Sequence, residues 1–217
     1  FGYAMADGSF TQAALIIKAG KLVEERYRGI AEGEVAIITS LSSTPTAQDP
    51  AFWQNDFGSR DRDSLVTSWS TAKSFTSILI GIAIEKGLID STSQPASDFI
   101  TEWQSDERSS ITIEQLLDMR SGLVPICFIA ETVSAGECQN ESDGAAGGNI
   151  VFAQDQMSAC IHRPLASDGA SYPWVSGGTY SAGEFLYANC DTQVLGEILY
   201  RATGQDPGIF AEAELFE

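Results

Sequence analysis

Residues 68–90 read SWSTAKSFTSILIGIAIEKGLID, and this stretch decides the fold of the chain. Apolar side chains recur at spacings of three and four residues from Phe75 to Ile82. This period predicts an amphipathic helix that begins at Ser70 and ends at Gly87, because glycine is a natural C-terminal stop.

The start of this helix carries a serine and a lysine in an S-x-x-K pattern. A helix places residues i and i+3 on one face, so Ser70 and Lys73 are expected within side-chain reach. The backbone N–H of Ser70, at the positive helix start, would point to where an oxyanion forms. Apolar neighbours predict burial of Lys73, which would favour a neutral amine able to take the serine proton. Alternatively, Ser70 only caps the helix and Lys73 extends to solvent, and the tetrad alone favours this second interpretation.

A second polar pair, Tyr187 and Asn189, precedes the helix predicted over 191–202. Residues two apart in an extended segment point to the same side. Tyr187 would relay a proton, and the Asn189 amide would hold a substrate carbonyl or fix Lys73. Such residues are common before helices, so this pair has little meaning without the first one.

The other elements follow from periodicity and turn residues. We expect strands at 13–18 and 22–27, a loop over 29–68, helices at 112–119, 155–162 and 191–202, and a loop over 164–183. The helix at 112–119 begins with a capping box formed by Thr112 and Gln115. Residues 124–149 are rich in Gly, Ala, Ser and acids, which indicates an insertion or a long surface loop.

The composition restricts the classes of partner. The 217 residues include 30 acidic and 12 basic ones, for a formal charge of −18 and a pI near 4.2. Such a surface repels phosphate backbones and anionic membranes, so nucleic acid is not an expected partner. No apolar run approaches the roughly 18 residues that a membrane span needs. The acidity fits a salt-adapted or extracellular protein, and equally an ordinary soluble surface.

Four cysteines, at 127, 138, 160 and 190, show no C-x-x-C spacing, and the sole histidine, His162, further weakens any zinc site. Four cysteines can form two disulfides, and three different pairings are possible. A Cys127–Cys138 bond would close a short loop, and a Cys160–Cys190 bond would tie a helix to the segment after Tyr187. Disulfides would imply a periplasmic or secreted protein, whereas free buried thiols are the alternative. Because the chain starts at Phe1 without a methionine, we expect a removed signal peptide or a trimmed chain.

Three blocks, in this order, resemble the serine β-lactamase-like hydrolases: the stretch at 68–90, ITIEQLLDMRSGL at 111–123, and FLYANCDTQVLGEILYRATGQ at 185–205. This group includes class C β-lactamases, D-alanyl-D-alanine carboxypeptidases, lactamase-fold esterases and 6-aminohexanoate-dimer hydrolases. The AKSFTS run at 72–77 and HRPLAS at 162–167 are most similar to the 6-aminohexanoate-dimer hydrolase and esterase branch.

The resemblance implies a role for each residue of the two polar pairs. Ser70 matches the acylated nucleophile, Lys73 its general base, and Tyr187 the residue that shuttles a proton to the leaving group. Asn189 matches the substrate-binding polar residue of the same motif. The implied reaction is acyl transfer from a small ester, linear amide or β-lactam to water, without metal or organic cofactor.

The implied fold is α+β, of the β-lactamase/transpeptidase-like kind, with an antiparallel sheet flanked by helices and a helical lobe. Residues 1–68 would supply the first strands, residues 69–185 the nucleophile helix and helical lobe, and residues 186–217 the Tyr-x-Asn loop and a helix returning to the sheet. The family's Lys-Thr-Gly or His-x-Gly strand would lie beyond residue 217. We therefore expect a fold that is incomplete at the C-terminus, completed by a missing segment or a second chain.

Two other functions compete with this one. A lactamase-fold binding or regulatory protein would keep the scaffold without turnover, but it would have no need of Ser70, Lys73 and Tyr187 together. A Ser-His-Asp hydrolase of the α/β type is disfavoured, because no G-x-S-x-G occurs and His162 would have to serve as its base. We expect His162 to be a surface or loop residue instead.

Overall fold

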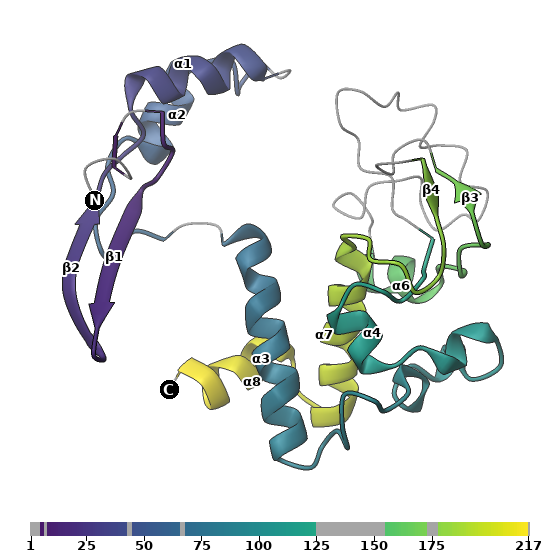
Figure 1. The fold of residues 1–217 in the computed structure, drawn as a ribbon. Helices are drawn as coiled ribbons and strands as arrows, with labels where there is room; N and C mark the ends of the chain where they lie inside the picture. The colour runs from purple at the N-terminus through teal and green to yellow at the C-terminus, as the bar shows by residue number, and fades with distance from the viewer. Residues whose placement is uncertain are drawn as a thin grey trace. The chain divides into compact units, whose positions relative to one another are not determined.

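A computed structural model of the chain describes residues 5–6, 8–42, 45–65, 68–124, 155–172 and 178–216 (Figure 1). These residues belong to two units, 1–67 and 68–217. The first unit begins with an antiparallel hairpin of β1 (Ala13–Lys18) and β2 (Lys21–Tyr27). Ala19 and Gly20 both have positive φ, 50° and 72°, as a two-residue turn of type I′ requires. The two predicted strands are confirmed.

The loop predicted for residues 29–68 is wrong, because it contains two helices, α1 (Glu32–Leu41) and α2 (Pro50–Phe57). The Asp49 side chain accepts the Ala51 N–H at 2.9 Å, so Asp49 caps α2 and Pro50 occupies its first position. These start signals were readable in the sequence.

Glu34 in α1 is buried and anchors the first unit. Its carboxylate accepts hydrogen bonds from Arg28 at 2.8 Å, from the Phe10 N–H at 2.6 Å and from the Ala31 N–H at 3.0 Å. The hydrogen bond from Arg28 is the main cause that lowers the pKa of Glu34 to about 2. The carboxylate therefore joins three separate stretches of this unit.

The second unit begins with a 3₁₀ turn, Trp69–Thr71, that leads into α3 (Ala72–Glu85). Gly87, with φ of 69°, follows the end of α3 and donates its N–H to the Ile84 carbonyl at 2.9 Å. The predicted nucleophile helix is therefore present, with a 3₁₀ first turn.

The three remaining predicted helices are confirmed. They are α4 (Ile113–Leu117), α6 (Gln156–Ile161) and α7 (Asn189–Thr203). Thr112 and Gln115 form the expected capping box of α4. Gly204 ends α7 in the left-handed region, with φ of 68°.

The shorter elements of the second unit connect these helices. They are the 3₁₀ turns Ala96–Asp98, Thr101–Trp103 and Glu107–Ser110, the paired strands β3 (Ala170–Ser171) and β4 (Thr179–Tyr180), helix α8 (Pro207–Ala211) and a π-helical turn, Glu212–Phe216. The predicted loop over 164–183 thus contains a strand pair of two residues each. Within the described ranges, no helix is long and apolar enough to cross a membrane.

Helix α7 forms the centre of this unit, where it contacts α3, α4, α6 and α8 (Figure 1). Four of its apolar side chains are buried in the core: Val194, Leu195, Ile198 and Leu199. Trp103 is also fully buried and donates its indole N–H to the Ile161 carbonyl at 2.7 Å. Because α3 packs on α7, the start of α3 and the segment that precedes α7 belong to the same packed unit.

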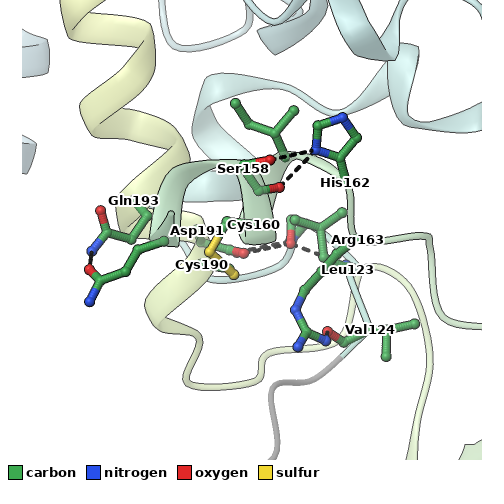
Figure 2. Close-up of a disulfide and its surroundings, with 12 residues drawn as sticks. Leu123, Val124, Ser158, Cys160, His162, Arg163, Cys190, Asp191 and Gln193 are labelled. Carbon is green, nitrogen blue, oxygen red and sulfur yellow. Dashed lines mark hydrogen bonds between the residues drawn. A yellow bond between two sulfur atoms is a disulfide. The ribbon is translucent and has the colours of Figure 1, made fainter. Parts of the chain in front are cut away.

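A disulfide joins Cys160 of α6 to Cys190 of α7, as one of the predicted pairings required (Figure 2). Both cysteines are buried. The other predicted pair, Cys127–Cys138, and nearly all of the insertion predicted at 124–149 lie outside the described residues.

Candidate active site

Ser70 and Lys73 face each other at the start of α3. Lys73 Nζ donates a hydrogen bond to Ser70 Oγ at 3.0 Å. The helical spacing of three residues sets this distance, so the contact needs no partner from elsewhere in the chain. Ser70 is exposed and therefore accessible to a reactant, whereas Lys73 is half-buried.

Tyr187 reaches the same two groups from the extended segment before α7. Its ring centroid lies 5.2 Å from Lys73 Nζ. The hydrogen bond that its side chain makes with Ser70 is the main cause that lowers the pKa of Tyr187 below its ordinary value of 10.0. A hydrogen bond to Lys73 and the charge of that residue act in the same direction. The three side chains thus lie together at the start of α3.

An open cavity of roughly 960 Å³ lies over this group. Its wall comes from α3, α6, α7, α8 and the segments next to them: Ser70, Ala72, Lys73, Thr76, Gln156, Met157, Tyr187, Asn189, Thr192, Gln193, Gly196, Glu197, Tyr200, Asp206, Pro207 and Gly208. All four residues singled out from the sequence lie on this one cavity. The glutamine pair that links Gln193 Nε2 to Gln156 Oε1 at 3.3 Å was not expected, because no spacing in the sequence relates α6 to α7.

The expected surroundings of Lys73 were partly wrong. Leu79 is buried, but Phe75 and Ile78 are 37% and 46% exposed. The buried stripe of α3 packs on α7, while the Phe75 ring meets Phe216 edge to face at 5.4 Å. The structure therefore supplies proximity to Ser70 and does not bury Lys73 among these apolar neighbours.

Sequence reasoning missed a buried carboxylate next to this site. Asp191, in the first turn of α7, is 1% exposed and accepts a hydrogen bond from Ser121 Oγ at 2.7 Å. Burial raises the pKa of Asp191 to about 7, and the hydrogen bonds from Ser121 offset only part of this rise. No local pattern marks the pair, since the two residues come from separate segments.

His162 follows the last residue of α6 and is exposed, as predicted. Its Nδ1 lies 2.8 Å from the Ser158 carbonyl oxygen (Figure 2). It does not line the cavity that holds Ser70. Within the described ranges, no cluster of three or more His, Cys, Asp or Glu side chains forms a candidate metal site.

A family model described as Beta-lactamase matches residues 6–217. Similar solved structures include a class C beta lactamase from Rhodobacter sphaeroides, with a TM-score of 0.55 at 14% identity over 94% of this chain and 42% of that one. A candidate 6-aminohexanoate-dimer hydrolase from Bacillus anthracis has a TM-score of 0.52 at 16% identity, over 95% of this chain and 44% of that one. A candidate beta-lactamase from Bacteroides dorei has a TM-score of 0.52 at 18% identity, over 92% of this chain and 43% of that one.

At these identities the likeness to solved structures shows the fold alone. The chain spans less than half the length of each of these structures. No curated protein matches the sequence.

Proposed function

Because the chain belongs to the beta-lactamase family, we propose that it is part of a serine hydrolase that cleaves a small ester or amide. The family and its α+β fold were both predicted from the three sequence blocks, and both predictions are confirmed. The observation that carries the proposal is the 3.0 Å contact between Ser70 Oγ and Lys73 Nζ beneath an open cavity. Tyr187 adds a titratable hydroxyl to the same contact.

The proposed reaction proceeds through an acyl-enzyme. The Lys73 amine takes the hydroxyl proton as Ser70 Oγ attacks the substrate carbonyl carbon, and the carbonyl oxygen becomes an oxyanion. Tyr187 then delivers its proton to the leaving oxygen or nitrogen while the bond from the carbonyl carbon to that atom breaks, and it takes up the proton that Lys73 holds. A lowered pKa suits Tyr187 to this step, because its hydroxyl gives up a proton more easily. A water molecule then gives a proton to Lys73 as its oxygen attacks the acyl carbon. The bond from that carbon to Ser70 Oγ breaks, the acid leaves, and Ser70 Oγ takes the proton back.

Asn189 is proposed to bind the substrate. It begins α7 and lines the cavity beside Lys73 and Tyr187. Its amide offers both a donor and an acceptor, which fits the carbonyl and N–H groups of an ester, a linear amide or a β-lactam. The Ser70 backbone N–H is proposed as one donor to the oxyanion.

A complete site is proposed to need a second oxyanion donor. The resemblance assigns this donor to a Lys-Thr-Gly or His-x-Gly strand. We propose that a further segment, or a second chain, supplies that strand, since the chain spans less than half the length of the solved structures above.

The Cys160–Cys190 disulfide supports a periplasmic or secreted location, because disulfides persist in oxidising compartments. The acidic composition, with a charge of −18, fits small substrates rather than polyanions.

The test is covalent labelling of the complete protein with a fluorophosphonate and, separately, with a labelled penicillin. Peptide mass spectrometry should place the adduct on Ser70. Ser70→Ala should abolish it, whereas Ser74→Ala, which removes an exposed hydroxyl on the same helix, should label normally. Absence of any Ser70 adduct would favour a binding protein without turnover. A panel of p-nitrophenyl esters, nitrocefin and aminohexanoate dimer would then separate the substrate classes.

A further inference from the structure

A buried carboxylate organises the turn that follows α4. Asp191 Oδ1 accepts the Ser121 hydroxyl at 2.7 Å, and Asp191 Oδ2 lies 3.4 Å from the Ser121 N–H. Ser121 Oγ in turn accepts the Leu123 N–H at 3.2 Å. Figure 2 shows Asp191 and Leu123 beside the disulfide that joins α6 to α7. The carboxylate therefore anchors the segment after α4 at Ser121.

The same turn holds the backbone on both sides of Tyr187. The Leu186 N–H donates to the Met119 carbonyl at 3.0 Å, and the Ala188 N–H points at Met119 Sδ at 3.5 Å. Met119 has a φ of 54°, a left-handed conformation that a side-chain-bearing residue keeps only when its surroundings enforce it. The supports of Tyr187 therefore depend on a strained turn.

Packing of the ring contributes little to the placement of Tyr187. The residue is 55% exposed. Its ring centroid nevertheless lies 5.2 Å from Lys73 Nζ. The two contacts to Met119 thus restrain the backbone on both sides of this side chain.

We propose that Asp191 and Ser121 are positioning residues for Tyr187: their hydrogen bond fixes the Met119–Leu123 turn, and that turn holds Leu186 and Ala188. This inference rests on the proposed function only for the role of Tyr187. Neither residue touches the substrate. The effect comes from the hydrogen bond between Ser121 Oγ and a side-chain oxygen at position 191, so an amide at position 191 should serve as well as a carboxylate.

The first experiment measures hydrogen exchange of the Leu186 amide in the complete protein. Ser121→Ala should speed this exchange on the order of tenfold, because the turn loses its anchor. Asp191→Asn should leave the exchange within about threefold of the wild type, since it keeps an oxygen for the serine hydroxyl. The control is Ser97→Ala, which removes a buried hydroxyl bonded to the Ser109 carbonyl at 3.0 Å and should not change Leu186.

The second experiment measures the rate of Ser70 acylation by a fluorophosphonate in a double-mutant cycle. Ser121→Ala should slow acylation roughly tenfold in the wild type, because a small misplacement of a proton-transfer group is costly. In a Tyr187→Phe background the same change should have almost no further effect. A general loss of structure would slow both backgrounds alike.

The two measurements separate this inference from the function it rests on. Unchanged Leu186 exchange in Ser121→Ala, or equal slowing in both Tyr187 backgrounds, would overturn the positioning role. A wild-type protein that never acylates would instead overturn the proposed function, and the exchange data would still decide whether Asp191 and Ser121 hold the Tyr187 segment. A thermal melt of each variant confirms that it is folded.

Discussion

Replacing Asp191 by asparagine should stabilise the second unit at pH 8 and have little effect at pH 4. The side chain is 1% exposed, and burial raises its pKa from an ordinary 3.8 to about 7. Between these two values the folded chain holds a proton that the unfolded chain has released. The free energy of unfolding therefore falls as the pH rises from about 4 to 7, because the folded state binds more protons there.

The size of the effect follows from the same two values. At about 1.36 kcal/mol for each pH unit, a rise from 3.8 to about 7 corresponds to roughly 4 kcal/mol of lost stability above pH 7. Asparagine has nearly the same shape, carries no charge and keeps an oxygen for Ser121. It should recover most of this loss at pH 8. Below pH 4 both side chains are neutral, so the two proteins should be similar.

The assay is urea unfolding of the wild type and the Asp191→Asn variant at pH 4, 6 and 8, followed by circular dichroism of the helices. The control is Asp168→Asn, which removes an exposed carboxylate from the same unit and should shift stability by less than about 0.5 kcal/mol at each pH. A stability difference between wild type and Asp191→Asn that did not grow from pH 4 to pH 8 would refute the claim that burial controls this carboxylate.

Three further predictions concern the rest of the chain. Glu34→Gln should destabilise the first unit by about 3 kcal/mol, because it breaks a buried ion pair. Since the pKa of Glu34 is about 2 in the folded chain, its contribution to stability is present above pH 4.5 and is lost as the pH falls toward 2. Urea unfolding would contradict this if the wild type lost no stability between pH 7 and pH 3. Replacing Cys160 and Cys190 by serine should lower stability by roughly 3–4 kcal/mol, the chain-entropy value for a separation of 30 residues, and a melt unaffected by dithiothreitol would contradict it. Gly204→Ala should cost about 1 kcal/mol because of its φ of 68°, whereas Gly196→Ala, inside α7 with open space around it, should stabilise by about 0.5–1 kcal/mol in thermal melts.

Most helices of the second unit could be predicted because local residues set where they start and stop. Thr112 and Gln115 cap α4 within one turn, and Gly204 ends α7 through its own φ. The two helices of the first unit were missed, since the polar stretch SSTPTAQDP at 42–50, between them, indicated a loop. The start of α2 was nevertheless marked by Asp49 and Pro50.

The sequence by itself determined the contact between Ser70 and Lys73, because helical geometry places residues three apart on one face. Only the tertiary structure decided that the Tyr187 ring lies 5.2 Å from Lys73 Nζ, and that Asp191 is buried against Ser121. Both depend on which face of α7 packs on the rest of the unit. Burial and contacts between distant segments arise from that packing, and no residue spacing along the chain encodes them.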